Sequence, residues 1–563
     1  MYKSNPGQMK LLFIDTPFEF IPDPNNRWVR LAELIPWDEL EVLSEYRRHF
    51  GSTGNPALPF RVALGALLVQ ARLNLTDEET VEQIRENPYL QHFLGYEGYN
   101  SSRRPFDPSM MVHFRKRLDA ETLKALDLRI YERRRELERA VEAARREEDD
   151  GGASPATDSG EDGEATSSTD MMDATDTADA TDSTDATDST DSASPTCTTD
   201  PADTTSSGES AAACDPSSER TLILDATCVP ADITYPTDLK LLVAAREDAE
   251  RIVDELWRSV DRRGRTKPRT RRRIAARHAL SVRKQRNLRG KNLRKALKKQ
   301  LSFLGRDLRF IDDLLSSLPS DSPSPLKERW TKRLDTIRTV HEQQKHMLDT
   351  RTHRVDQRIV SLSQPHVRPI VRGKAGANVE FGAKILVAVE DGHTFLVASS
   401  WENFNESALF ARACEEYRER NGAWPDVVCA DMIFRTRANL SWCRGRGIRL
   451  SGPSLGRPPK DRERLEERKR IERLDASRRN EVEGKFGEAK RKFGLDLVRC
   501  KLAETSESLV AIRFMIMNLW RMLRLFLSFI PAVRKRPLIV FFRKLPVRIS
   551  MFLSLRSFPG ACA

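Results

Sequence analysis

The sequence of 563 residues lacks several features that mark familiar classes of protein. Its eight cysteines form no Cys-x-x-Cys pair and have no histidine at zinc spacing, so neither a disulfide framework nor a structural zinc site is indicated. Its first residues lack the basic segment, long apolar run and small-residue cleavage site of a secretion signal. The most apolar stretch, 509–530, is interrupted by three arginines, which argues against a membrane span. These absences predict a cytoplasmic protein.

Nucleotide-binding signatures are missing as well. None of the Gly-Lys pairs, which begin at positions 290, 373 and 484, is followed by the serine or threonine that completes a phosphate-binding loop. We therefore expect no nucleotide cofactor.

Basic residues are absent from one long segment and abundant elsewhere. Residues 151–219 contain 17 acidic side chains and neither lysine nor arginine, and consist mainly of Asp, Thr, Ser, Ala and Gly. Such a segment has too little apolar surface to offset the entropy of ordering it, so a disordered insertion is expected at 149–219. The rest of the chain is more basic than the overall charge of +11 suggests. A body this basic favours a polyanionic partner, of which DNA and RNA are the usual examples.

The N-terminal part is predicted to form short helices. Residues 60–73 are apolar on most faces, and Thr76 with Glu79 has the capping-box spacing that opens a second helix, which runs to about residue 86. A third helix is expected from Asp107 onward, carrying Arg115, Lys116 and Arg117. This pattern fits a helix-turn-helix-like reader of DNA, and it fits a small helical bundle with a solvated basic face equally well.

Residues 241–350 are predicted to be helical and very basic. Between positions 261 and 310 there are 20 lysines and arginines against two acids, and Arg271, Arg272 and Arg273 are expected to contact DNA phosphates. From position 301 to 318, leucines and one isoleucine alternate spacings of three and four, as in the seam of a coiled coil, and a second helix follows. The expected helical hairpin leaves two alternatives, packing within the chain and self-association.

Strand-like runs lie on both sides of this helical block. They cover residues 221–229, 384–389, 394–400, 426–430 and 447–451, and the second and third are joined by a Glu-Asp-Gly-His turn typical of a hairpin. A long charged segment at 458–492 is predicted to be helical. The order of elements predicts an α/β domain split by an insertion.

Three acids stand out by position. Asp225 lies inside the first strand, Asp431 lies at the exit of a later strand, and Glu483 lies on the helix that follows the sheet. Carboxylates from strands and a facing helix can converge, and their oxygens suit hard divalent cations such as Mg²⁺. Two such ions can support in-line displacement at a phosphodiester. The plainer alternative for each aspartate is an ordinary strand-end or turn residue.

The third acid belongs to a local pattern, Arg479-x3-Glu483-x6-Lys490. On a helix, steps of four and seven return to the same face, so two cations would flank the carboxylate and could hold phosphates. The alternative is a solvated helix with ion pairs between residues four apart.

Several blocks of the sequence resemble the DDE transposases of insertion sequences, which have an RNase H-like catalytic domain and an N-terminal helical domain. The blocks are residues 87–89, 93–95 and 114–118, the Leu-Ile-Leu-Asp-Ala-Thr run at 222–227, the Ala-Asp-Met-Ile-Phe-Arg-Thr-Arg run at 430–437, the Leu-Ser-Gly-Pro step at 450–453 with 456–460, and the Arg-x3-Glu-x6-Lys helix. The resemblance extends roughly over residues 45–120 and 220–525, and the order of the blocks is that of the family.

The resemblance implies a catalytic triad of Asp225, Asp431 and Glu483 that holds two Mg²⁺ ions, or Mn²⁺ in their place, with Asp225 bridging them. Arg479 and Lys490 would position DNA phosphates. The tyrosine that the family usually carries just upstream of the arginine has no counterpart here, which puts one hydrogen bond to DNA in question. The implied reaction is hydrolysis at each transposon end, followed by attack of the freed 3′-hydroxyl on target DNA. It requires no covalent nucleophile.

The resemblance also implies partners and a layout. Double-stranded DNA would supply both the terminal inverted repeats and the target, a homodimer would hold two ends together, and the protein would associate with the nucleoid. The layout is an RNase H-like α/β domain split by a basic helical insertion and preceded by an all-α domain and a disordered acidic linker. The predicted segments are an N-terminal helical domain at 1–148, an acidic insertion at 149–219, a split catalytic domain at 220–240 and 375–531, a basic helical insertion at 241–374 and a basic tail at 532–563. Two rivals remain: a catalytically inactive DNA-binding protein derived from a transposase, and a related RNase H-like nuclease.

Overall fold

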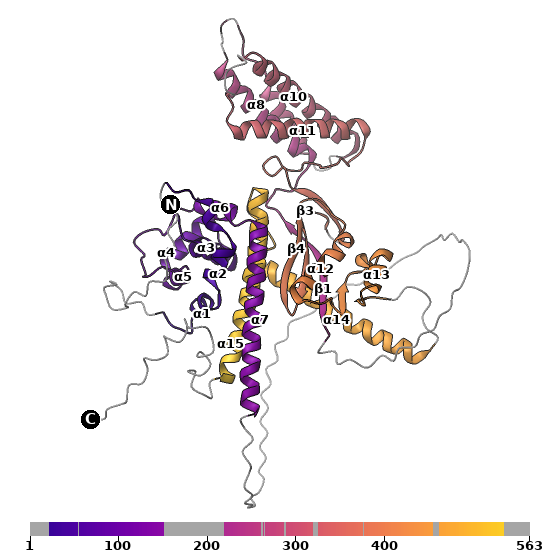
Figure 1. Cartoon of the computed structure of the whole chain (residues 1–563). Helices are drawn as coiled ribbons and strands as arrows, with labels where there is room; N and C mark the ends of the chain where they lie inside the picture. The colour runs from indigo at the N-terminus through magenta and orange to yellow at the C-terminus, as the bar shows by residue number, and fades with distance from the viewer. Residues whose placement is uncertain are drawn as a thin grey trace, which may run out of the picture. The chain divides into compact units, whose positions relative to one another are not determined.

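A computed structural model of the chain describes residues 22–53, 56–150, 219–260, 263, 265–285, 289–318, 325–374, 377–453 and 461–533 (Figure 1). The chain divides into two compact units, one combining residues 1–141 with 219–563 and the other covering 142–218. Apart from the end of one helix, the described elements belong to the first unit. The predicted disordered insertion at 149–219 and basic tail at 532–563 lie almost wholly outside the described residues.

The N-terminal part is helical, as predicted. Its elements are α1 (Arg27–Leu34), α2 (Trp37–Leu43), η1 (Tyr46–His49), α3 (Phe60–Leu73), α4 (Asp77–Glu86), α5 (Pro88–Phe93), α6 (Met110–Arg117) and the long α7 (Ala120–Asp150). The capping box is confirmed, because the Thr76 side chain accepts from the Glu79 backbone N–H while the Glu79 carboxylate accepts from the Thr76 N–H. The third predicted helix begins at Met110, three residues later than expected.

A six-stranded mixed sheet forms the centre of the described structure. Its strands are β1 (Thr221–Pro230), β2 (Arg368–Lys374), β3 (Ala377–Glu390), β4 (His393–Ser400), β5 (Val427–Ala430) and β6 (Arg449–Leu450). The order is β2-β3-β1-β5-β6, with β4 also paired to β3. β1 runs antiparallel to β3 and parallel to β5. The predicted hairpin is confirmed: Asp391 and Gly392 both have positive φ, as a tight turn between β3 and β4 requires.

One strand and one boundary differ from the prediction. β2 was not expected, and it pairs with the first half of β3. It lies within residues 241–374, which were assigned to the helical insertion, so the sheet resumes before position 375. Only the pairing partner identifies this short strand, since its own sequence contains three charged residues, a proline and a glycine within seven positions.

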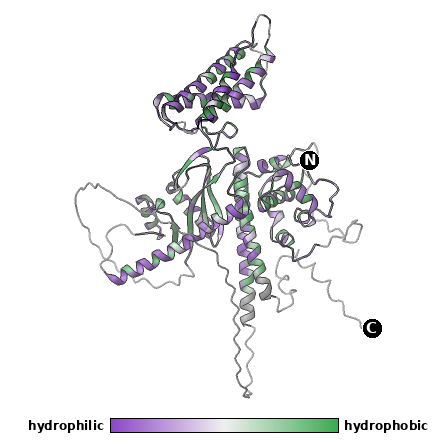
Figure 2. Cartoon of the chain, turned by 180° about the vertical axis from the view of Figure 1, so that it is seen from behind, coloured by the Kyte–Doolittle hydropathy of each residue, from purple (hydrophilic) through white to green (hydrophobic). Residues whose placement is uncertain are grey.

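Helices between and after the last strands of the sheet complete the fold. They are η2 (Glu406–Leu409), α12 (Phe410–Asn421), η3 (Met432–Phe434), α13 (Arg437–Arg444), α14 (Arg462–Phe493) and α15 (Ala503–Val533). α14 starts after Asp461, whose side chain caps it, and ends at Gly494 in the left-handed conformation. It is hydrophilic along most of its length (Figure 2). None of the helices among the described residues combines the length and apolar composition that crossing a membrane requires.

Alternation along β1 separates two apolar cores. Ile223 and Val229 face a core that includes α14, α15 and the N-terminal helices, whereas Leu222 and Leu224 face a core that includes α12. α15 lies beside α7 and contacts α3 and α6 (Figure 1), and Asn518 on α15 donates to Asp127 on α7 at 3.1 Å. The helices assigned to 1–148 therefore share a core with the sheet, which the predicted boundary at 148 would have separated.

The segment between β1 and β2 is a helical bundle. It contains α8 (Asp238–Ser259), α9 (Arg272–Arg283), α10 (Gly290–Ser316) and α11 (Glu328–Thr350). Leu304, Leu308 and Ile311 of the predicted seam are buried in a core formed with α8 and α11. Packing within the chain accounts for the heptad-like leucines, so they give no reason to expect self-association.

Candidate active site

Asp225 and Asp431 are neighbours at the point where β5 ends beside the middle of the parallel strand β1. Leu224 of β1 pairs with Ala430 of β5, and each aspartate is the next residue along its strand. Neighbouring strands lie about 4.8 Å apart, so the two aspartates occupy adjacent positions. Both belong to the alternating set that faces α14, because Ile223 and Cys429, two residues earlier in each strand, pack in the core that includes that helix.

α14 brings Glu483 to this end of the sheet. Val482, Phe486 and Ala489 form its buried row, at spacings of four and three, and Glu483 lies just beside that row with 56% of its side chain exposed. α14 contacts both β1 and β5. The helix is therefore held against the two strands beside which the aspartates lie.

Arg479 connects the acids of the strands and the helix. Its Nη1 lies 3.3 Å from Asp431 Oδ1 and its Nη2 lies 3.0 Å from Glu483 Oε1. The second contact is the ordinary ion pair between residues four apart that the sequence allowed as an alternative, and the first reaches across to the sheet. Burial works against the charge of Arg479, but its hydrogen bond with Glu483 and the nearby Asp431 and Asp225 carboxylates raise its pKa.

The electrostatic environment of Asp225 differs from that of an exposed aspartate. Burial raises its pKa to about 6, against the lowering effects of the Ala226 N–H and of Arg479, while Asp431 and Glu406 raise it further. Asp431 is 48% exposed and accepts a hydrogen bond from the Met432 N–H at 2.7 Å. A carboxyl that binds its proton this tightly lies in a place where an added positive charge is favourable.

Lys490 and Thr227 extend the site along β1. Lys490 Nζ lies 3.4 Å from Thr227 Oγ1, two residues beyond Asp225 on the same face of the strand. The sequence analysis did not single out Thr227, although alternation from Asp225 would have indicated it. It also missed Glu406, which pairs with Lys384 at 2.8 Å and influences Asp225 electrostatically. Glu406 is the first residue of η2, which follows β4, and no pattern in the sequence relates it to Asp225.

The described residues bring the predicted ligands near one another without forming a ready metal cage. No group of three His, Cys, Asp or Glu side chains among them is close enough to hold one ion. The donor set nevertheless fits a hard cation, because it consists of carboxylate oxygens and because Arg479 already places positive charge between Asp431 and Glu483.

The predicted DNA contacts of α6 need one correction. Arg115 is 4% exposed, and its guanidinium binds Asp77 at 2.6 and 2.9 Å and Gln70 at 2.9 Å. It fastens α6 to α3 and α4 and does not lie on a basic surface. Lys116 is exposed, whereas Arg117 is half-buried with its guanidinium 4.6 Å from the centre of the Phe50 ring.

The predicted DNA contacts of the insertion are exposed. Arg271 and Arg273 are free to reach solvent, while Arg272 forms a two-pronged contact with Asp254 of α8 at 2.9 Å. Of these three arginines, the middle one therefore has a structural partner.

Comparisons with known proteins match both ends of the chain. Residues 16–117 match the family described as "Transposase domain (DUF772)", and residues 428–520 match the family described as "Transposase DDE domain". The second match covers Asp431, Glu483, Arg479 and Lys490, and it begins after Asp225.

A protein of Rhizobium meliloti, described as an uncharacterized protein, ORF8 in the nfe locus, is 32% identical over 126 residues. The aligned part is 22% of this chain and spans 59% of that relative's length. No solved structure matches the chain.

Proposed function

From the premise that this chain is an insertion-sequence DDE transposase, we propose that it cuts DNA at transposon ends and joins the freed ends to a target. The observation that carries the proposal is the adjacency of Asp225, in the middle of β1, and Asp431, just after β5, with α14 directing Arg479 and Glu483 toward them. The two matched domains, one on each side of the insertion, support the same conclusion.

We further propose that the sheet is RNase H-like. In its favour, β4, β3 and β1 are successive antiparallel neighbours, and β5 and β6 continue the sheet in parallel on the other side of β1. The proposed active site lies where the central strand meets its first parallel neighbour. The helical bundle, inserted between β1 and β2, leaves this end of the strands intact.

Asp225, Asp431 and Glu483 are the proposed ligands for divalent cations, two Mg²⁺ or Mn²⁺ ions. Bound ions of this kind supply Lewis-acid activation of the attacking oxygen and neutralise charge on the leaving oxygen. Arg479 must release at least one carboxylate for both Asp431 and Glu483 to serve as ligands. Its guanidinium is then available to bind a DNA phosphate, and Lys490, beside β1, can bind a second. Displacement at phosphorus by water or a 3′-hydroxyl needs no protein nucleophile from this set.

The proposed substrate is double-stranded DNA. We propose that the N-terminal helices recognise the terminal inverted repeats, with Lys116 exposed for phosphate contact, and that a homodimer holds two ends. Asp225, Asp431 and Glu483 are all retained, which favours an active enzyme over an inactive DNA-binding derivative.

The test is nicking of a duplex that carries the element's own terminal sequence, with Mg²⁺ or Mn²⁺ added. Asp225→Asn and Glu483→Gln should abolish nicking while DNA retention stays at the wild-type level. Glu481→Gln is the matched control, because this exposed acid lies two residues from Glu483 and so on another side of α14. Its nicking should equal that of the wild type.

Two results would decide against the proposal. If the wild type retains the duplex and nicks under neither metal, the inactive DNA-binding rival gains. If it cleaves RNA–DNA hybrids or junctions in preference to terminal duplexes, the related-nuclease rival gains.

A further inference from the structure

One stretch of the helical insertion carries positive charge alone. From position 271 to 299 the sequence contains no acidic residue, and α9 together with the first half of α10 falls within it. Burial on these helices is confined to a narrow face, so most of the lysines and arginines project into solvent.

A row of exposed basic side chains lies on one side of α9. Ala275, Ala279 and Val282 are buried, at steps of four and three. Arg273, Arg277 and Lys284 lie on the opposite side, where Leu280, 55% exposed, completes a row at steps of four, three and four. No ion pair between described residues involves these three cations, so their charge is not neutralised within the described structure.

The first half of α10 repeats the arrangement. Ala296 and Gln300 are buried, whereas Lys291, Lys295 and Lys298 are exposed at steps of four and three. Two helices that are consecutive in the chain thus each present a row of cations.

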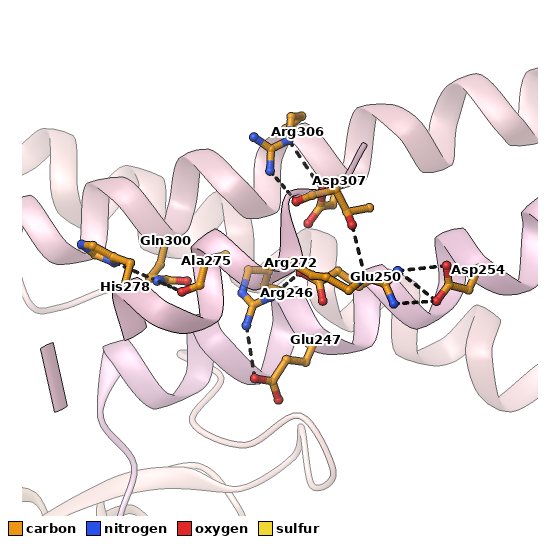
Figure 3. A network of polar contacts seen from close by, with 11 residues as sticks. Arg246, Glu247, Glu250, Asp254, Arg272, Ala275, His278, Gln300, Arg306 and Asp307 are labelled. Carbon is orange, nitrogen blue, oxygen red and sulfur yellow. Dashed lines mark hydrogen bonds and ion pairs between the residues drawn. The ribbon is translucent and has the colours of Figure 1, made fainter. Parts of the chain in front are cut away.

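A network of polar contacts, partly exposed and partly buried, holds α9 in place (Figure 3). Arg272 binds Asp254 of α8, and Arg306 of α10 donates to the Thr270 carbonyl at 2.7 Å, just before α9 begins. Gln300 of α10 donates to the Ala275 carbonyl at 3.2 Å and lies 3.0 Å from His278 Nδ1. α9 is therefore anchored to both of its neighbours, and its cations are presented with little orientational freedom to lose on binding.

α11 of the same bundle provides a contrast. Its exposed cations, Arg329, Lys332 and Lys345, are interspersed with acids along the same helix, and Lys332 pairs with Glu328 at 2.7 Å. Mixed charge of this kind suits a solvated surface. The single sign of charge on α9 and α10 calls for another explanation.

We propose that α9 and the first half of α10 form a second surface for duplex DNA, which binds the phosphate backbone without regard to sequence. This insertion basic surface consists of Arg273, Arg277, Lys284, Lys291, Lys295 and Lys298. The choice of DNA as the polyanion rests on the proposed function. The surface binds DNA outside the terminal repeats, either the flank of the element or the target. Release of counterions from the phosphates drives this binding, and Leu280 adds an apolar contact among the cations.

The test measures binding of the full-length protein to a fluorescent duplex that lacks terminal repeats, in EDTA, over a series of salt concentrations. Replacing Arg273, Arg277 and Lys284 together by glutamine should weaken binding. It should also make the negative slope of log affinity against log salt shallower by roughly 2 to 3, at about 0.9 per lost phosphate contact. The matched control, Arg329→Gln with Lys332→Gln and Lys345→Gln, removes the same charge from α11. Its slope should stay at the wild-type value.

A second variant probes the apolar contact. Leu280→Ser removes no charge, so it should weaken binding at every salt concentration by a similar factor and leave the slope unchanged. Thermal unfolding of all variants shows whether the exposed positions affect folding.

The outcomes separate this inference from the proposed function. If the α9 variant binds and responds to salt as the α11 control does, the inference is overturned, even if terminal duplexes are nicked. Tighter retention of an RNA duplex than of the DNA duplex also overturns it. If the wild type does not nick the terminal duplex, but the α9 variant binds duplex DNA more weakly than the wild type does, the proposed function is wrong and the insertion basic surface is supported.

Discussion

Two clusters of acids and arginines in this chain have similar chemistry and different access to solvent. The sheet-end cluster contains Asp225, Asp431, Glu483 and Arg479, and the insertion cluster contains Asp307 with the groups around it. Burial is the main reason that the pKa of Asp225 is raised to about 6 and that of Asp307 to about 7. Each cluster therefore contains one carboxyl group, that of Asp225 or Asp307, whose negative charge is disfavoured by burial.

Exposure separates the two clusters. Asp431 and Glu483 are about half exposed, so a cation or a DNA phosphate can reach them. Asp307 is fully buried, and within the described structure neither of its carboxylate oxygens has a hydrogen-bond partner. Its nearest cation is Arg306, with Nε 3.8 Å from Oδ1. A raised carboxyl pKa therefore indicates a binding site only where a ligand can reach the carboxyl group. Where the carboxyl group is sealed from solvent, its burial destabilises the fold.

The same substitution in each cluster should change the rate of nicking by very different amounts. Asp225→Asn removes a proposed metal ligand and should lower the rate of nicking by on the order of 10³-fold or more. Asp307→Asn lies in the inserted bundle and should change nicking only a few-fold. The measurement is single-turnover nicking of the terminal duplex. Equal losses in the two variants would show that the clusters do not differ as described.

The arginines should differ in stability. Arg246 is 1% exposed and forms an ion pair with the buried Glu250. Arg246→Met leaves the Glu250 charge without its partner and should lower the free energy of unfolding by about 3 to 5 kcal/mol. Arg479→Met, in the sheet-end cluster, breaks pairs that are largely exposed and should cost no more than about 1 kcal/mol. Chemical denaturation of both variants tests this difference, and similar losses would contradict it.

Asp307 should make stability depend on pH. Its folded-state pKa is about 7, raised by burial and by Glu250 against the lowering effects of Arg306, Arg246 and Arg272. In the unfolded chain it is about 4. The folded state then binds the extra proton between these values, so the contribution of this group to stability falls as pH rises from about 4 to about 7 and is constant above that range.

Asp307→Asn removes this dependence. The variant should unfold like the wild type near pH 4 and be more stable by about 4 kcal/mol above pH 7, since the folded and unfolded pKa values differ by about three units and one unit corresponds to about 1.4 kcal/mol. Denaturation across this pH range measures the difference. A difference that does not vary with pH would show that Asp307 is ionised alike in both states.

A moderate effect is expected of Lys490→Gln at the edge of the sheet-end cluster. Lys490 contacts Thr227 and is proposed to bind a phosphate, so its loss should raise the DNA concentration needed for half-maximal nicking by about tenfold, a little over 1 kcal/mol. The maximal rate should change less. Thr227→Val is a companion variant, and an effect of either substitution on the maximal rate alone would contradict a positioning role.

Local patterns in the sequence predicted most elements of the fold. The capping box at Thr76, the Asp391–Gly392 turn and the strand around Asp225 depend on residues close together in the chain, and all three are confirmed. β2 could not be found in this way, because its strand character comes from pairing with β3. For a similar reason, no local pattern shows that α15, nearly 400 residues later, completes the core of the N-terminal helices.

The candidate site was predictable in part. The strand positions of Asp225 and Asp431 follow from short apolar runs, and parallel pairing then makes them neighbours. That Arg479 reaches Asp431 could not be foreseen, because a helical spacing relates it only to Glu483. The basic run of α6 was misleading at Arg115: charge in a sequence does not reveal whether a carboxylate from another helix, here Asp77, neutralises it.

The sequence by itself determined the type and approximate position of most helices and strands, which residues could carry chemistry, and that one segment of the insertion is purely basic, because these depend on residue types and short spacings. Only the tertiary structure decided which charges are exposed, which are sealed in, and which meet across β1, β5 and α14. The reason is physical: burial and the distances between charges arise from contacts between segments far apart in the chain, and they set how strongly each charge interacts with water, with its neighbours and with a ligand.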